Sequence, residues 1–302
     1  MKGEYDMKKQ VMITSLLFFL TLGLASCGSS RENEIIVGGK EFTEQQIFTH
    51  LMSELIEDRT DLKVTRKAAL GGTQVIFSAI TNDDIDIYID YTGTGYVSIL
   101  GYDPISDPTI VYNTVKEELL SKHDIVVLDQ IDVNNTYVLA VTKDFAQENN
   151  LSKISDLKSI SDTMIGGFTY EFINRQDGLI GLEEAYDLSF KENSAFEGSL
   201  RYQALLNNDV QITTAFSTDS LIKKFDLVSL EDDLSFFPPY YAVPFLRKEV
   251  YEKHPELEAI LKELGDVLDD ETMVNLNYEV DENAKEPREV ARNFLLEKGL
   301  IS

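Results

Sequence analysis

The order of apolar and polar residues predicts an α/β fold with two lobes. Short strands and helices alternate over residues 34–90, and a second series of the same kind runs over residues 136–230. Alternation at this spacing is typical of crossover units around a largely parallel sheet. An apolar segment at residues 242–246 follows the second series and can return to the first sheet, so each lobe is expected to hold one sheet flanked by helices.

The first series begins directly after a short polar stretch. Thr43 and Gln46 have the spacing of a helix-capping box, and the apolar residues from Ile47 to Ile56 follow a helical period. Ile85, Ile87 and Ile89 alternate along one face, as in a strand. The elements expected here are strand 34–37, a helix from 43, strand 62–68, helix 74–80 and strand 84–90.

The second series and the end of the chain complete the two lobes. The expected elements are helix 111–122, strand 124–128, strand 136–142, short helix 156–160, strand 164–168, helix 178–186, helix 200–206, strands 210–216, 226–230 and 242–246, and helices 255–268 and 286–297.

The predicted lobes are joined by two crossings, near Asn134 and near Phe236. The first lobe then comprises residues 34–134 and 236–302, and the second comprises residues 135–235. A cleft between two such lobes is a natural small-ligand site that closes by hinge motion.

The N-terminus predicts export and lipid anchoring. A basic start is followed by the apolar stretch 11–24, which matches a secretory signal and is short for a membrane span. Leu24-Ala25-Ser26-Cys27-Gly28 resembles the bacterial lipobox. We therefore expect a signal peptide at 1–26, diacylglycerol on Cys27 and a polar tether at 27–33. An ordinary signal peptide with an incidental cysteine is the alternative, and Met7 could be the start.

Composition excludes several classes of protein. The formal net charge is −26, so phosphate backbones are repelled and nucleic-acid binding is not expected. Cys27 is the only cysteine, which rules out a disulfide within one chain and a cysteine-rich metal site.

The sequence also lacks the usual catalytic signatures. It contains no Gly-x-Ser-x-Gly, no His-Glu-x-x-His and no phosphate-binding glycine loop. The three histidines are scattered, and the acidic cluster around Asp83 and Asp90 lacks the pattern of a calcium loop, so we interpret it as solvated turn and strand ends. No catalytic residue, metal or cofactor is therefore expected, although a lipid-anchored enzyme or adhesin with a cleft remains an alternative.

Six motifs, in their order along the chain, are the most specific feature. They are GGKEFTEQ, GGTQVIFSAI, DYTGTG, EFINRQDG, TAFSTD, and LEDD followed by FFPPYYAVP. In this combination the sequence resembles the substrate-binding proteins of glycine betaine/carnitine/choline ABC importers over nearly all of residues 34–301. The resemblance implies a type II periplasmic-binding-protein fold and a receptor that is not an enzyme.

The resemblance also implies an aromatic cage for a trimethylammonium head. A quaternary nitrogen has no N–H to donate, so aromatic faces attract it instead. Matched by motif, the cage residues are Tyr91, Tyr137, Phe216 and Tyr240, with Tyr241 as a competitor of Tyr240. A tyrosine is usual at the position of Phe216, where the ring is kept and the hydroxyl is lost.

Three polar residues match the family's contacts to the ligand carboxylate: Lys40, Thr94 and Arg175. An arginine can offer such a carboxylate two parallel hydrogen bonds. The implied ligand is glycine betaine first, with carnitine, proline betaine and choline as further candidates, while another small solute such as a polar amino acid is the alternative. The implied partners are a membrane permease and a separate cytoplasmic ATPase, at the outer face of a bacterial cytoplasmic membrane.

Overall fold

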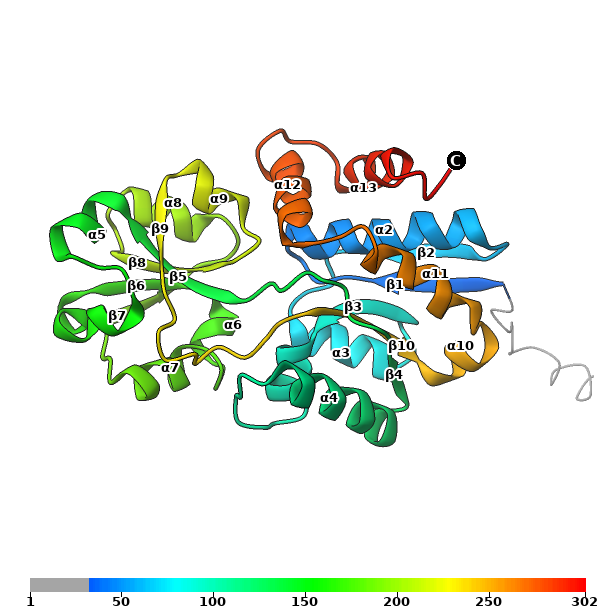
Figure 1. Cartoon of the computed structure of the whole chain (residues 1–302), viewed down its shortest axis with the longest axis horizontal. Helices are drawn as coiled ribbons and strands as arrows, with labels where there is room; N and C mark the ends of the chain where they lie inside the picture. Colours follow the sequence, from blue (N-terminus) through cyan, green and yellow to red (C-terminus); the bar gives the residue numbers. More distant parts are fainter. Residues whose placement is uncertain (1–32) are drawn as a thin grey trace, which may run out of the picture. The chain divides into compact units, whose positions relative to one another are not determined.

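The computed structural model describes residues 33–302, which hold two five-stranded sheets (Figure 1). The predicted signal peptide, Cys27 and the tether up to residue 32 lie outside the described residues. Within residues 33–302, no helix has the length and apolar character needed to cross a membrane.

The first sheet has the strand order β2-β1-β3-β10-β4. β1 and β3 are parallel, whereas β10 is antiparallel to both of its neighbours, β3 and β4. The late strand β10 thus returns to the sheet of the first series, as predicted. The strands are β1 Glu34–Gly38, β2 Lys63–Lys67, β3 Ile87–Tyr91, β4 Ile125–Val127 and β10 Ala242–Arg247.

The second sheet has the order β7-β6-β8-β5-β9. β6 is parallel to β7 and β8, and β5 is antiparallel to β8 and β9. Both sheets are therefore mixed. The strands are β5 Tyr137–Thr142, β6 Ile165–Phe168, β7 Glu192–Ala195, β8 Ile212–Phe216 and β9 Leu227–Leu230.

Helices flank both sheets (Figure 1). The segments before β5 and after β10 contribute α2 Thr43–Arg59, α3 Thr73–Thr81, the π-helix η1 Thr94–Ile99, α4 Pro108–His123, α10 Lys248–Lys253, α11 Glu256–Gly265, α12 Asp270–Asp281 and α13 Pro287–Glu297. The segment between contributes α5 Lys143–Asn149, the 3₁₀-helices η2 Ile154–Ser159 and η3 Ser161–Thr163, α6 Tyr170–Ile173, α7 Leu179–Tyr186, α8 Leu200–Leu206 and α9 Ser220–Lys224.

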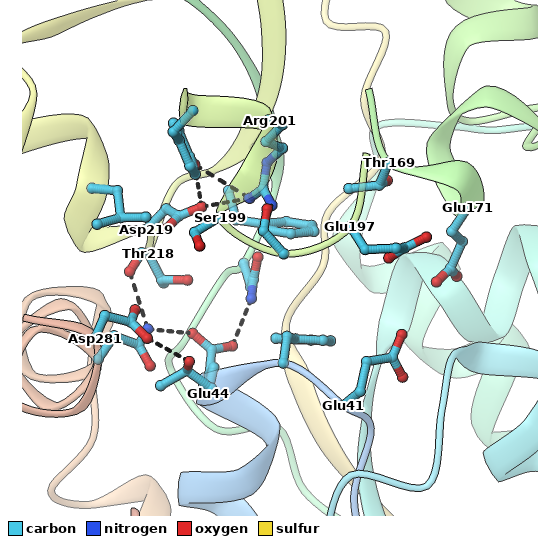
Figure 2. Close-up of a pocket in the computed structure, with 18 of the residues that line it drawn as sticks. Glu41, Glu44, Thr169, Glu171, Glu197, Ser199, Arg201, Thr218, Asp219 and Asp281 are labelled. Carbon is cyan, nitrogen blue, oxygen red and sulfur yellow. Dashed lines mark hydrogen bonds and ion pairs between the residues drawn. The ribbon is translucent and has the colours of Figure 1, made fainter. Parts of the chain in front are cut away.

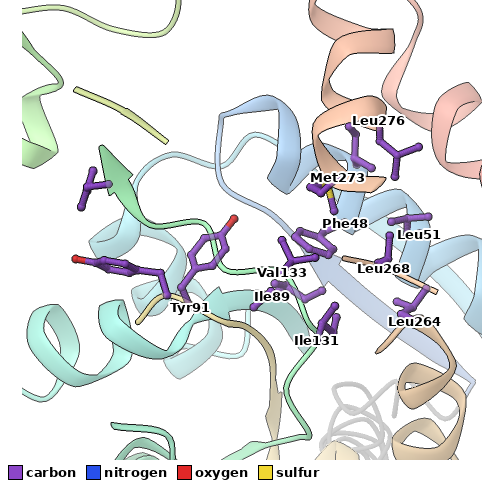
Figure 3. Close-up of a cluster of buried hydrophobic side chains, with 14 of the residues drawn as sticks. Phe48, Leu51, Ile89, Tyr91, Ile131, Val133, Leu264, Leu268, Met273 and Leu276 are labelled. Carbon is purple, nitrogen blue, oxygen red and sulfur yellow. The ribbon is translucent and has the colours of Figure 1, made fainter. Parts of the chain in front are cut away.

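The core of the first lobe forms where α2 packs on the sheet and under the C-terminal helices (Figure 3). Phe48 of α2, Leu264 of α11 and Met273 of α12 are all completely buried, and Ile89 brings β3 into the same cluster. Burial of this kind contributes roughly 1.5–3 kcal/mol per large apolar side chain. The buried face of α2 therefore fixes this helix to the core of the lobe.

The chain passes between the sheets twice, at residues 128–136 and 231–241, and these two segments pair with each other. Asn134 and Tyr241 form an antiparallel bridge. The Asn135 N–H donates to the Tyr240 carbonyl at 3.1 Å, and the Tyr240 N–H donates to Asn134 Oδ1 at 2.7 Å. Pairing of the two crossings keeps the two lobes aligned, so that a motion of one lobe against the other would bend these two short segments.

The predicted capping box at Thr43 and Gln46 is wrong. The N-cap residue of α2 is Phe42, whose side chain cannot accept a hydrogen bond. Thr43 instead donates to Asp281 of α12, and Gln46 donates to the Glu41 carbonyl. The spacing of the two residues fits a capping box, but the Thr43 hydroxyl forms a tertiary hydrogen bond with α12 instead.

Two aspartates interpreted as solvated are buried. Asp86 is 4% exposed and accepts from the Ile36 N–H and from Arg247. Asp90 is fully buried and forms an ion pair with Lys40. The alternating isoleucines of β3 set the strand direction correctly, but they could not reveal that distant cations cover its acidic positions.

Candidate functional site

All seven sequence-predicted ligand residues line one small pocket with a volume of about 30 Å³. Because the two crossings bring both lobes to this point, the pocket receives residues from each of them. Its lining comprises Lys40, Tyr91, Thr94, Tyr137, Arg175, Phe216 and Tyr240, together with Phe42, Asn135 and Glu171.

The four predicted rings are delivered by strand ends. Tyr91 is the last residue of β3, and Tyr240 stands two residues before β10. Tyr137 opens β5 and Phe216 closes β8, and these two residues are direct partners in the antiparallel ladder. Residues opposite each other in such a ladder have neighbouring side chains, so the sheet itself sets this half of the pocket.

The rings are in contact with one another. The ring centre of Tyr137 lies 5.2 Å from that of Phe216 and 5.5 Å from that of Tyr240, the latter edge-on at 84°. Tyr240 is 2% exposed, whereas no ring contact or pocket lining involves Tyr241 among the described residues. The geometry therefore favours Tyr240 over its competitor.

Phe42 is a fifth ring that sequence reasoning missed. It stacks on Tyr91 at 6.4 Å and on Phe216 at 5.8 Å, with interplanar angles of 20° and 13°. It stands in the GGKEFTEQ motif two residues after Lys40, and this motif was the available signal. Phe42 therefore lies between the Tyr91 and Phe216 rings.

Lys40 is buried and already paired. Its Nζ lies 2.7 Å from Asp90 Oδ1 and 3.0 Å from Thr73 Oγ1, and 5.5 Å from the centre of the Tyr91 ring. Thr94, at the start of η1, is 3% exposed in the same pocket. Lys40 therefore lines the pocket with one N–H beyond those used by its two partners.

Arg175 is likewise held by carboxylates. Its Nε donates to Asp177 Oδ1 at 2.7 Å, a second nitrogen donates to Asp177 Oδ2, and a third donates to Glu171 at 2.9 Å. The guanidinium carbon lies 5.7 Å from the centre of the Tyr137 ring. Burial would raise the pKa of Glu171, but Lys40 and Arg175 hold that pKa below its usual value.

Two cage tyrosines donate their hydroxyl groups to buried carboxylates. Tyr91 donates to Glu44 at 2.6 Å and accepts from Gln45 at 3.1 Å. Tyr240 donates to Asp177 at 2.6 Å. Burial, together with these carboxylates, raises the pKa of both tyrosines well above the usual value, so both hydroxyls stay protonated.

A larger pocket of about 570 Å³ shares part of this lining (Figure 2). Glu41 from the loop before α2, Glu171 from α6 and Glu197 from the loop before α8 contribute carboxylates to it. Burial raises the pKa of Glu41, and the neighbouring Glu171 adds to this effect. Carboxylates that line a pocket favour a cation over an anion there.

Several hydrogen bonds join the two lobes across the site. Thr73 of α3 donates to Glu171 of α6 at 2.6 Å. Asn277 of α12 donates to the Thr218 carbonyl at 3.1 Å, and an ion pair links Lys224 of α9 to residue Glu282 after α12. These contacts exist only while the lobes are together. Over residues 33–302, no cluster of three or more histidine, cysteine or acidic side chains could hold a metal ion.

Comparison with known proteins matches this architecture to one family. The family model described as the substrate binding domain of ABC-type glycine betaine transport system matches residues 33–297. A carnitine transport binding protein from Listeria monocytogenes is 36% identical over 94% of this chain and 93% of its own length. An ergothioneine transport permease/ergothioneine binding protein from Helicobacter pylori is 34% identical over 97% of this chain, which spans 54% of that protein.

A solved structure agrees with the sequence matches. The crystal structure of a glycine betaine/carnitine/choline ABC transporter protein superposes with a TM-score of 0.73 at 31% identity, covering 89% of this chain and all of the other. The mixed sheets, their flanking helices and the paired crossings are those of a type II periplasmic-binding-protein fold. The chain belongs to the family of substrate-binding proteins of ABC-type glycine betaine transport systems.

Proposed function

We propose that the protein captures quaternary-ammonium osmoprotectants in a cage formed by Tyr91, Tyr137, Phe216 and Tyr240. The observation that supports this most directly is the convergence of four rings, from two separate sheets, on one pocket. Each ring facing a desolvated cation contributes about 0.5–2 kcal/mol, so four rings can supply most of a micromolar affinity. Phe42 is a further ring available to the head group.

Lys40, Thr94 and Arg175 are proposed to receive the tail of the ligand. Three of the five N–H groups of Arg175 are used internally, which leaves two for a ligand oxygen. A carboxylate tail, as in glycine betaine, carnitine or proline betaine, can accept these bonds. Choline has a hydroxyl in this place and can use the same groups less fully.

The receptor role follows from the family and the two lobes. We propose a first lobe of residues 34–134 and 236–302 and a second of residues 135–235, which close on the ligand because the half-cages meet only then. Substrate-binding proteins of ABC importers are extracytoplasmic. The closed form would deliver its ligand to a permease driven by a separate ATPase, and the protein itself would catalyse no reaction.

Calorimetric titration of the purified protein tests the ligand class. We expect glycine betaine, carnitine, proline betaine or choline to bind with a micromolar dissociation constant. Lysine and glutamine serve as competitors that represent the polar-amino-acid alternative, and ergothioneine is included because of the Helicobacter pylori relative. No binding of any quaternary ammonium at millimolar concentration contradicts the proposal, and turnover of a bound compound would favour an enzyme.

Lipid anchoring through Cys27 is a separate part of the proposal. A diacylated cysteine followed by a short tether would keep the receptor near its permease and raise the local concentration without new contacts. The variant Cys27→Ala is expected to leave the membrane fraction while keeping its ligand affinity. If that variant stays with the membrane, an anchor other than the lipid is at work.

A further inference from the structure

Glu44 is the one carboxylate of the site that is buried without a counter-ion. Its side chain belongs to α2 and is 2% exposed, and none of the lysine, arginine or histidine side chains described forms a salt bridge with it (Figure 2). A buried carboxylate without a cation is costly, and it is usually paired or protonated. The position of this carboxylate beside the proposed cage suggests that the bound cation offsets the cost of burying it.

The partners of Glu44 favour its ionised form. Tyr91 donates to it at 2.6 Å, Asn135 at 2.7 Å and Asn277 at 3.3 Å. All three are donors, and a carboxylate surrounded only by donors is stabilised in its charged state. Burial raises the pKa of Glu44, and these hydrogen bonds oppose that rise.

The internal cations near the rings differ from Glu44 because each of them is already paired. Lys40 near Tyr91 is neutralised by Asp90. The other two are Arg175 near Tyr137, paired with Asp177, and Arg201 near Phe216, paired with Asp219. Arg175 is shared with a second carboxylate, that of Glu171, whose side chain is 38% exposed. Glu44 is therefore the buried carboxylate beside the rings that has no cation as a partner.

The bond from Tyr91 carries the effect of this charge to the cage. A phenol that donates to a carboxylate is polarised so that its ring becomes more negative. Gln45 donates to the hydroxyl oxygen of Tyr91, which strengthens the hydrogen bond that this hydroxyl donates to Glu44. In a site shielded from water such fields are stronger than in solution. A cation over the face of the Tyr91 ring is attracted by both the ring and the carboxylate at the hydroxyl edge.

We propose that Glu44 is a positioning and specificity-determining residue for which the ligand's own positive charge serves as the counter-ion, acting through the Tyr91 ring. The proposal rests on the proposed cage. It implies that the difference in affinity between a quaternary ammonium and a neutral group of the same shape is larger than the rings alone would produce. Removing the charge at Glu44 should reduce that distinction.

The experiment compares choline with 3,3-dimethyl-1-butanol, in which a carbon replaces the nitrogen, and glycine betaine with 3,3-dimethylbutanoate. Dissociation constants are measured by calorimetry, with competition for weak probes. For Glu44→Gln we expect about tenfold weaker binding of choline, the charged probe, and a change below about threefold for 3,3-dimethyl-1-butanol, the neutral probe. In the second pair, glycine betaine should weaken in the same way relative to 3,3-dimethylbutanoate, because only glycine betaine carries the quaternary nitrogen. The matched control is Glu57→Gln, which removes a carboxylate of the same helix that lines neither pocket, and both probes should change by less than about threefold.

The results distinguish the possible roles. Equal weakening of both probes by Glu44→Gln, or no weakening of the charged probe, overturns the proposal. Where the neutral probe is too weak to quantify, equal affinities of Glu44→Gln and Glu57→Gln for choline overturn it. Should Glu44→Gln not fold, as judged by thermal unfolding, Tyr91→Phe cuts the link while keeping the charge and must also lower the preference for the cation. Failure of the unaltered protein to bind any quaternary ammonium would instead refute the proposed function.

Discussion

At the scale of single residues, the cage rings are held by bonds at their edges as well as by packing. Tyr91 and Tyr240 are oriented by Glu44 and Asp177, while Tyr137 is fixed by its ladder partner Phe216. A ring held in place before the ligand arrives loses little entropy on binding, which favours affinity.

The variants Tyr91→Ala and Tyr137→Ala should each weaken binding of a quaternary ammonium by about twofold to thirtyfold, because one cation–π contact of about 0.5–2 kcal/mol is lost. Calorimetry measures the change, and circular dichroism checks that the fold is retained. Phe236→Ala, on the second crossing outside the cage pocket, is a suitable aromatic control. Affinity equal to that of the unaltered protein in either variant would exclude that ring from the cage.

His50 should make stability depend on pH. Burial, with Arg66 and Arg288 nearby, lowers its pKa to about 4, whereas the unfolded chain has a value of about 6.5. Between these values the unfolded state binds more protons, so the stabilising contribution is complete above about pH 6.5 and is lost as the pH falls towards 4. Since the side chain is partly exposed, we expect no more than about 1 kcal/mol.

Urea unfolding of the protein and of His50→Gln between pH 4 and pH 7 measures this contribution. The variant should show a flatter dependence of unfolding free energy on pH in that window. His254→Gln is the control, because His254 pairs with Glu256 and lies outside the core. Identical pH dependence in His50→Gln and the unaltered protein contradicts the assignment.

At the scale of elements, strand ends and the turns after them place the ligand residues. The turn between β3 and η1 is tight, because a Cβ on Gly93 would lie 2.8 Å from the Pro239 carbonyl oxygen and 2.8 Å from the Tyr240 ring. Only glycine leaves room there for the second crossing to approach β3. The DYTGTG motif therefore supplies a close approach as well as a cage ring.

Gly93→Ala should displace Tyr240 and weaken ligand binding by about tenfold or more, since contacts below 3 Å force backbone or ring shifts. Calorimetry measures the loss. The control is Ser98→Ala on the adjoining η1. Gly101→Ala is unsuitable as a control, because a φ of 79° at that position strains any side chain. Unchanged affinity in Gly93→Ala would mean that Tyr240 is free to move without cost.

At the scale of the whole molecule, closure depends on a few contacts that join the lobes. One of them is the 2.6 Å hydrogen bond from the Thr73 hydroxyl to Glu171, a residue that lines the pocket of the proposed cage. Such contacts add affinity because they form only in the closed state, and a ligand shifts the equilibrium by its difference in affinity for the two states.

Thr73→Val should raise the dissociation constant several-fold, because the variant loses the donor to Glu171 and the acceptor for Lys40. Thr73→Ser keeps the hydroxyl and should bind nearly as the unaltered protein does. Small-angle scattering with and without ligand reports closure alongside calorimetry. Equal affinity of the valine and serine variants would show that this bond has no part in closure.

The sequence alone determined the two sheets, the return of the last strand and the identity of the seven residues that meet in one pocket. The apolar period of the buried strands predicted the sheets, whereas the seven residues came from the resemblance of their motifs to those of the family. The sequence did not reveal β7, α12 or the contact of Thr43 with Asp281.

Only the tertiary structure decided how the site is charged. Asp90 and Asp177 are both completely buried, and they neutralise Lys40 and Arg175, which the sequence presented as free cations. Glu44 stands in a motif that predicted a helix start, yet it lies behind Tyr91 without a counter-ion. The physical reason is that charge pairing depends on distances between segments remote in sequence, whereas periodicity and motifs report only what lies along the chain.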